Sequence, residues 1–292
     1  MSKTLSFEVG IATATLYPTW SSGTSSDGGV DKVRGDLALQ LIDAAIEKGY
    51  QIVIVDGGSS QEFKQALKDK VQHVYDQDEP GMSAGRRQAF STVSQLSGVS
   101  VVCWTEPEKV SMVRDCLQIA ATPVLNGEAD IVVPSRDAAS FATYPNYQVD
   151  FEVGVDRDWN RIVRDSGLMS ETQDELDVCI GPRIIWNDPV ILRYFMNRYR
   201  YKDIAEKESN TLELWPNALF TPLIHALKDG VKVVSIPVPY RHPEVQTHLE
   251  SDSEQFRQKR AFQRQVLLEG AEAFIDYLQK VQDDPSVIIE AY

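Results

Sequence analysis

The sequence has few cysteines, few histidines and no long apolar run. Among its 292 residues are 3 Cys and 4 His. Cys103, Cys116 and Cys179 lie far apart and give neither a disulfide framework nor a zinc-binding spacing, so a cytoplasmic location is expected. The apolar runs are strand-sized, far below the roughly 20 residues that span a bilayer. The first residues lack the apolar stretch of a signal peptide, so neither secretion nor a membrane span is predicted.

Basic residues are also scarce. The chain carries 29 Lys and Arg against 43 Asp and Glu, a formal net charge of −14. Nucleic acids and anionic membranes bind proteins through basic surfaces, so neither is an expected partner. A small anionic substrate held by a few local arginines is compatible with this charge. The hydrophobic content of 42% is ordinary for a globular protein and excludes a disordered or fibrous class.

The first half of the chain alternates short apolar runs with amphipathic segments. The run Ile52-Val53-Ile54-Val55 is typical of a strand buried on both faces of a parallel sheet. This alternation predicts an α/β fold in which helices flank a mostly parallel central sheet. The expected strands are 9–12, 52–55, 73–75, 99–104 and 129–133, and the expected helices are 36–48, 61–70, 83–96 and 110–125.

The second half is less regular, and no linker separates it from the first. We therefore expect one domain over residues 1–245 and a C-terminal helical extension over 246–292, which packs on that domain or on a second subunit in a homodimer. Residues 141–155 are aromatic and polar without clean periodicity. The expected helices here are 159–167, 188–199, 215–228 and 253–281. The expected strands are 178–186, which contains a Gly-Pro turn, and 231–238.

Polar side chains follow nearly every expected strand. Ligands bind at the carboxyl ends of the strands in parallel α/β sheets, so these residues are expected at one edge of the sheet. Taken in chain order, they are Thr13, Tyr17, Asp56, Glu106, Glu108, Arg136 and His242.

Two of these segments are acidic, and each allows two interpretations. Asp56-Gly57-Gly58-Ser59 can place a carboxylate against a ribose or a base, or it can be a turn in which a serine caps the next helix. Glu106-Pro107-Glu108 can hold a hard divalent cation through its oxygens, or it can be a turn with two solvated acids near a helix N-terminus.

Six segments, in the same order along the chain, resemble the motifs of family 2-like glycosyltransferases with the GT-A fold. The resemblance covers roughly residues 8 to 245 and includes a strand ending in V-D-G-G-S and an E-P-E where that family carries D-x-D. The segments are Ile52 to Ser60, Gly81 to Ala89, Val99 to Glu108, Ala129 to Arg136, Gly181-Pro182-Arg183 and Leu227 to Val238.

The resemblance implies a nucleotide-binding half over residues 1–137 and an acceptor half over 138–245. It implies transfer of a sugar from a nucleotide-diphosphate sugar, with Mg²⁺ or Mn²⁺ neutralising the charge on the leaving diphosphate. Carried over to this sequence, Asp56 and Gly57 contact the base or ribose, and Thr13 and Tyr17 line the nucleotide pocket. Arg86 lies near the base or diphosphate, and Glu106 and Glu108 serve the metal or the sugar.

The sequence departs from the family at several of these positions. Glu is longer than Asp, so a metal held by Glu106 and Glu108 would sit farther out, and Lys109 could offset their charge. Arg87 stands where the family usually has Asn. A metal-independent member, or one that binds nucleotide sugars without catalysis, therefore stays an alternative. A nucleotidyltransferase is disfavoured, because no Gly-rich loop follows the first expected strand.

His242 follows the last expected strand. In retaining GT-A enzymes of the glucosyl-3-phosphoglycerate synthase and mannosylglycerate synthase type, a histidine at this place completes the metal site, so His242 favours retention. An inverting enzyme needs a carboxylate base, for which Glu213 is the candidate; a Glu at a helix start is the alternative explanation. Arg136 and Arg183 are expected to bind an anionic acceptor, because an Arg fork matches a phosphate or carboxylate; surface ion pairing would explain them equally well.

Overall fold

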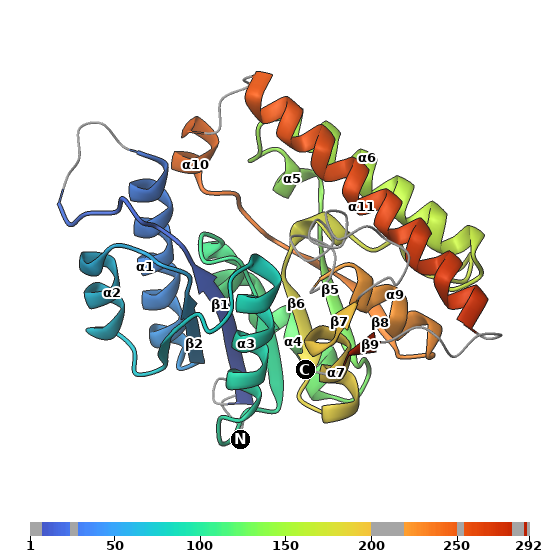
Figure 1. Cartoon of the computed structure of the whole chain (residues 1–292), viewed down its shortest axis with the longest axis horizontal. Helices are drawn as coiled ribbons and strands as arrows, with labels where there is room; N and C mark the ends of the chain where they lie inside the picture. The colour runs from blue at the N-terminus through green and yellow to red at the C-terminus, as the bar shows by residue number, and fades with distance from the viewer. Residues whose placement is uncertain (1–7, 24–28, 200–218, 250–253, 282–288, 291–292) are drawn as a thin grey trace.

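A seven-stranded sheet with helices on both faces forms the centre of the protein (Figure 1). The structure is a computed structural model and describes residues 8–23, 29–199, 219–249, 254–281 and 289–290. The strand order is β3-β2-β1-β4-β6-β5-β8. All neighbouring strands pair in parallel except β6, which is antiparallel to both β4 and β5. The prediction of a mostly parallel sheet is therefore confirmed.

The strands lie close to the expected positions. The sheet strands are β1 (Val9–Thr15), β2 (Gln51–Asp56), β3 (Val74–Asp76), β4 (Val101–Trp104), β5 (Ile131–Arg136), β6 (Arg183–Trp186) and β8 (Val233–Val238), and a separate two-stranded ladder joins β7 (Arg198–Tyr199) to β9 (Ile289–Glu290). In the segment 178–186, expected to be a strand with a Gly-Pro turn, only the residues after that turn form a strand, β6. A 3₁₀ turn, Val178–Ile180, precedes β6, because Asp177 accepts a hydrogen bond from the Ile180 amide and closes the turn.

The helices are longer or shorter than expected at several places. They are α1 (Val30–Lys48), α2 (Gln61–Lys68), α3 (Met82–Ser94), α4 (Leu117–Leu125, after a π-helical turn, Met112–Cys116), α5 (Ala138–Phe141), α6 (Asn146–Asp165), α7 (Pro189–Met196), α9 (Thr221–Lys228), α10 (Glu244–Leu249) and α11 (Glu254–Val281). The helix expected at 159–167 begins at Asn146, so α6 takes in most of the aperiodic stretch. Of the helix expected at 215–228, residues 215–218 lie outside the described part, and α9 begins only at Thr221.

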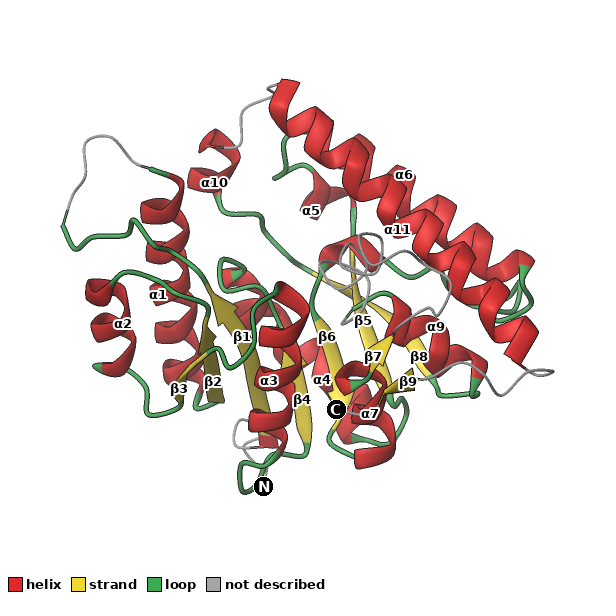
Figure 2. Ribbon diagram, in the orientation of Figure 1, coloured by secondary structure: helices red, strands yellow, loops and turns green. Residues whose placement is uncertain are grey.

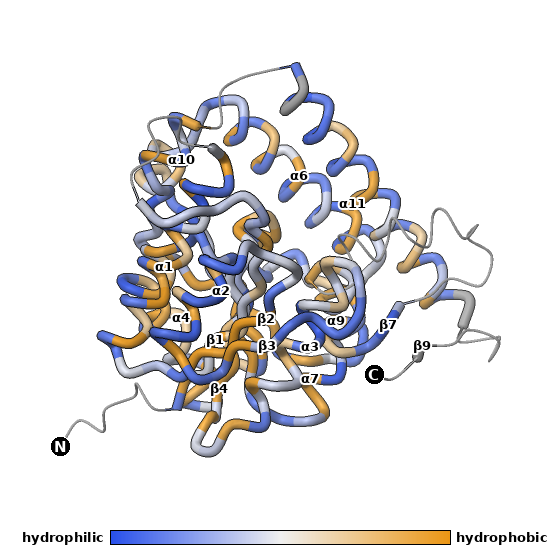
Figure 3. The backbone as a smooth tube through the Cα atoms, turned by 60° about the vertical axis from the view of Figure 1, so that its left-hand side comes forward, coloured by the Kyte–Doolittle hydropathy of each residue, from blue (hydrophilic) through white to orange (hydrophobic). Residues whose placement is uncertain are grey.

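Helices α3 and α7 lie on one face of the sheet and α1 and α4 on the other (Figure 2). The C-terminal helix α11 runs alongside α6 and also contacts α9, so the extension packs on the domain. No helix within the described ranges is long and apolar enough to cross a membrane. Figure 3 shows hydrophobic residues gathered in the strands of the sheet.

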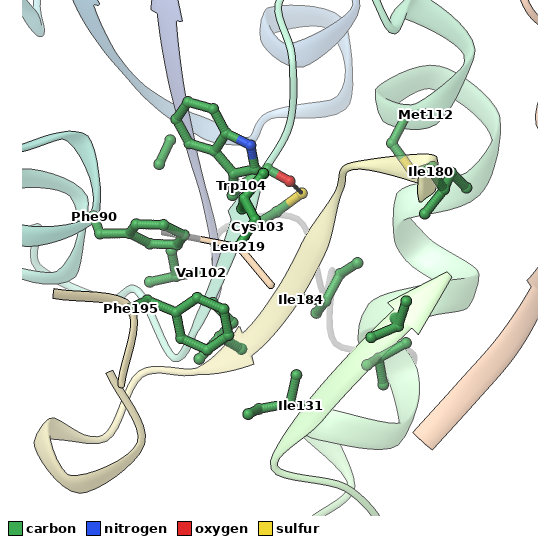
Figure 4. Packing of buried hydrophobic residues seen from close by; sticks show 14 of the residues in the cluster. Phe90, Val102, Cys103, Trp104, Met112, Ile131, Ile180, Ile184, Phe195 and Leu219 are labelled. Carbon is green, nitrogen blue, oxygen red and sulfur yellow. Dashed lines mark hydrogen bonds between the residues drawn. The ribbon is translucent and has the colours of Figure 1, made fainter. Parts of the chain in front are cut away.

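Three aromatic side chains pack together in the core near the end of β4. Figure 4 shows Phe90 of α3 beside Trp104 of β4 and Phe195 of α7. The centroid of the Phe90 ring lies 5.8 Å from that of Trp104 and 5.5 Å from that of Phe195. Cys103 is fully buried beside them as a free thiol. This packing fixes the end of β4, so the acidic turn that follows it starts from a rigid position.

Candidate functional site

A cavity of about 910 Å³ opens at the carboxyl ends of β1, β2 and β4. Residues that follow these strands and β8 form one wall, and α1, α3, α6, α10, α11 and the loops after β3 and before β6 contribute further lining residues. Among the residues predicted from sequence, the cavity brings together Tyr17, Gly57, Arg86, Glu106, Glu108, Lys109 and His242. The expectation that these side chains meet at one sheet edge therefore matches the described geometry.

The two glutamates of the acidic turn point to different sides of the cavity. Oε1 of Glu108 accepts a 2.8 Å hydrogen bond from the Tyr17 hydroxyl, on the β1 side. Glu106 instead lies against Gly181, before β6, so closely that a Cβ atom there would overlap its carboxylate. Its Oε2 is buried and has no hydrogen-bond partner among the described residues. Burial raises the pKa of Glu108, although the nearby Arg34 charge opposes the shift.

The predicted metal ligands are not assembled. Within the described ranges, no three or more His, Cys, Asp or Glu side chains are grouped so that they could hold one ion. The His242 ring stacks on Tyr144, with centroids 4.3 Å apart. The residues present therefore do not fit the metal site that Glu106, Glu108 and His242 were expected to form.

Two cations, Arg86 and Lys109, face this cavity and make no direct contact with a carboxylate of the described residues. The Arg86 guanidinium lies 5.3 Å from the Trp104 ring, and its Nε and Nη1 atoms are buried without a hydrogen-bond partner in the described part of the chain. Burial lowers the pKa of Arg86 to about 10, against the opposing charge of Glu106, so the group stays charged at neutral pH. Lys109 sits 5.2 Å over the Tyr240 ring.

Thr13 and Asp56 do not line the cavity. The Thr13 hydroxyl donates to the Thr105 carbonyl at 2.8 Å and ties β1 to the end of β4. Asp56 accepts hydrogen bonds from the Thr15 hydroxyl at 2.8 Å and the Ser59 amide at 2.9 Å. In these positions both residues organise the turns beneath the site, while the neighbouring Gly57 reaches the cavity wall.

Arg136 and Arg183, expected to bind an anionic acceptor, are both buried in internal contacts. Arg136 pairs with Glu152 and, at 2.6 Å, with Asp177. The terminal nitrogens of Arg183 donate to the backbone carbonyls of Val178, Gly181 and Pro182, at 2.8, 3.1 and 2.9 Å. Arg183 is 0% exposed. These arginines hold the 3₁₀ turn and the loop before β6, which corrects the expectation, and Glu213 lies outside the described residues.

Several lining residues were not expected from the sequence. Their signals were weak, because single polar residues on long helices or after short strands look like ordinary surface positions. They are Arg34 of α1, Gln77 and Asp78 after β3, Trp104 of β4, and Lys259, Arg260 and Gln263 of α11. Gln148 and Glu152 of α6 also line the cavity, and both belong to the aromatic and polar stretch over residues 141–155.

A second hollow of about 380 Å³ lies beside β3 and α3. Its lining includes Asp76 and Asp78 but no Lys or Arg, which suits an anionic ligand poorly. The larger cavity lies at the carboxyl ends of the strands and is lined by cationic side chains, so it is the better candidate site.

No family model matches the chain, and no curated protein matches its sequence. Solved structures of glucosyl-3-phosphoglycerate synthase from Mycobacterium tuberculosis are similar in fold. The complex with Mn²⁺ and UDP-glucose has a TM-score of 0.56 at 8% identity, covering 91% of this chain and 79% of that one. The UDP complex gives 0.55 at 9% identity, and the phosphoglyceric acid complex 0.53 at 9%, each covering 91% of this chain and 80% of that one. The protein therefore has the GT-A glycosyltransferase fold.

Proposed function

We propose that this protein is a glycosyltransferase that moves one sugar from a nucleotide-diphosphate sugar to a small soluble acceptor. The observation that carries the proposal is the cavity at the strand ends of a GT-A fold, with Arg86 and Lys109 in its wall. Its volume of about 910 Å³ falls within the usual range for small-molecule sites, about 300–1,000 Å³. Arg86 and Lys109 supply the positive charge that a diphosphate requires.

The donor in this proposal is a UDP- or GDP-sugar, supported by the UDP-glucose and UDP complexes of the similar structures. The acceptor is anionic, supported by the phosphoglyceric acid complex. Arg136 and Arg183 are used in internal contacts, so other cations must bind the acceptor anion. In this proposal they are Arg260 and Lys259, on the α11 side of the cavity. The homodimer and the cytoplasmic location stay predictions from the sequence.

In the proposed reaction an acceptor hydroxyl oxygen bonds to the anomeric carbon as the bond from that carbon to the diphosphate oxygen breaks. The nucleoside diphosphate leaves with the electron pair and takes up the hydroxyl proton. Preorganised cations at the diphosphate stabilise the charge that develops there, which is commonly a large catalytic term. Retention of anomeric configuration stays a prediction from the sequence. No divalent ion has a role in this scheme, because Glu106, Glu108 and His242 do not form a metal site.

Screening donor hydrolysis and transfer across UDP- and GDP-sugars tests the proposal. We expect release of UDP or GDP from one donor, and loss of that release in Arg86→Met but not in Arg114→Met, which replaces an exposed arginine. NMR of the product then reports the anomeric configuration. Donor binding without turnover would identify a non-catalytic nucleotide-sugar-binding protein, and pyrophosphate release from a nucleoside triphosphate and a sugar phosphate would identify a nucleotidyltransferase.

A further inference from the structure

We propose that Lys109 and Arg86 hold the diphosphate of the bound nucleotide in place of a divalent metal ion. This inference rests on the proposed function, because it takes a nucleoside diphosphate as the ligand. It goes further by assigning the neutralisation of the diphosphate charge to two side chains of this protein. Nucleotide binding then needs no added metal ion.

The two carboxylates of the acidic turn contact different parts of the fold. Glu108 accepts the Tyr17 hydroxyl at 2.8 Å, and Glu106 rests against Gly181 on the other side of the turn. A hard divalent cation needs several oxygens converging on one point at about 2.0–2.6 Å. Bringing Glu106 and Glu108 together would require breaking the Tyr17 contact and moving Glu106 away from the loop before β6.

Lys109 is held where a cation is needed. Its backbone N–H donates to the Glu106 carbonyl at 3.1 Å, which closes the turn after β4. The ammonium then lies 5.2 Å over the Tyr240 ring, in the cavity wall. Within the described residues it forms no ion pair at contact distance, although the charges of Glu106 and Glu152 act on it from farther away, so a phosphate can make a direct contact with it.

Arg86 approaches the same cavity from α3. Packing on Trp104 orients the guanidinium, and two of its nitrogens are buried without a protein acceptor in the described ranges. A buried donor without a partner is costly, and an anion that accepts from it removes that cost. The guanidinium fork matches phosphate oxygens in pairs, while an ammonium acts as a point charge. Together they provide two positive charges, the same number that a divalent metal ion supplies.

These cations also disfavour a metal ion nearby. Like charges repel strongly in a partly desolvated cavity, where the effective dielectric constant is well below that of water. Lys109 and Arg86 both lie within electrostatic reach of Glu106, and they offset the negative charge that would attract a metal ion.

Titration calorimetry with UDP and with GDP, each in EDTA and then in Mn²⁺, tests the inference on the intact wild-type chain. We expect one of the two nucleotides to bind in EDTA, with a dissociation constant within about twofold of that in Mn²⁺, a difference below about 0.4 kcal/mol. Binding only in Mn²⁺ would overturn this inference and leave the proposed function standing. No binding of either nucleotide under both conditions would overturn both.

Substitution of the lysine gives a second test that does not involve metal. In EDTA we expect Lys109→Gln to weaken binding of that nucleotide about tenfold or more, because it removes a charge-assisted contact, and Lys109→Arg to restore most of the affinity. Lys48→Gln, at the exposed end of α1, is the matched control and should bind as the wild type does. Wild-type affinity in a folded Lys109→Gln variant would overturn the inference. Should Lys109→Gln fail to fold, the wild-type titration in EDTA still decides it.

Discussion

Gly181 and the Glu106 carboxylate are in direct contact across the cavity. The backbone of Gly181 has a φ of +95°, a conformation that side chains rarely adopt. A Cβ atom at this position would also overlap both oxygens of Glu106. Two independent constraints, one on the backbone and one on the neighbouring carboxylate, therefore require glycine here.

Gly181→Ala should lower stability and also displace Glu106. Gly127→Ala is the matched control, because Gly127 has a φ of +71° and nothing within 4 Å of the added methyl group. We expect the control to lose about 1–2 kcal/mol of unfolding free energy from backbone strain alone, and Gly181→Ala to lose more. Urea unfolding measures both. Equal losses in the two variants would contradict the contact between Gly181 and Glu106.

Arg183→Met should destabilise the fold by about 3 kcal/mol, because three buried carbonyls lose a charged donor. Arg157→Met, at an exposed position, should change stability little. Thermal and urea unfolding compare the two. Unchanged stability together with weaker binding of phosphoglyceric acid would instead support the acceptor role expected from the sequence.

Because Asp156 and Asp177 are buried as a pair, the stability of the fold should depend on pH. Burial raises the pKa of Asp156 well above 3.8, and the charge of Asp177 raises it further, although Arg136 opposes the shift. A carboxyl with a raised pKa contributes its stability fully at low pH and loses it as the pH rises through the folded-state pKa.

Asp156→Asn removes that loss and retains a donor toward Asp177. The variant should therefore gain stability relative to the wild type as the pH rises from 4 to 8. Thermal unfolding across this range measures the difference. A difference that stays constant with pH would show that Asp156 ionises normally in the folded protein.

His225 should make the stability of the fold decrease as the pH falls, which is the opposite of the effect of Asp156. Burial against α7 and α11 lowers its pKa to about 4 from 6.5, although Asp229 opposes the shift. The unfolded chain binds this proton first, so the folded state loses stability as the pH falls from 6.5 towards 4, by up to about 3 kcal/mol. His225→Gln should flatten the acid limb of a stability curve, whereas the exposed His248→Gln should leave it unchanged. The same slope in wild type and His225→Gln would rule out this contribution.

The sheet could be predicted because its signals are local. The run from Ile52 to Val55 is apolar throughout and bounded by polar turns, which defines a buried strand without reference to the rest of the chain. Placing polar residues at the strand ends then followed from the geometry of parallel sheets. Tyr17 and Glu108 meet in one cavity for that reason, whereas Arg86, on α3, was expected there only from the family resemblance.

The roles of individual charged residues could not be predicted in the same way. Arg183 and Arg86 look alike in the sequence, yet the first is satisfied by carbonyls of its own loop and the second has unpartnered nitrogens at the cavity. Glu106 and Glu108 are separated by one proline, and whether they converge depends on Tyr17 and Gly181, which lie far away in the chain. Tertiary contacts determine which partners these charged side chains have, and such contacts produce no local pattern in the sequence.

The central claim is that the cavity at the strand ends binds a nucleotide-diphosphate sugar through its cations. The most direct measurement is calorimetric titration of UDP- and GDP-sugars into the wild type, Arg86→Met and Arg114→Met. We predict saturable binding of one donor at one site per chain, unchanged in Arg114→Met and weakened about tenfold or more in Arg86→Met. No donor binding in the wild type, or equal binding in all three proteins, would contradict the account.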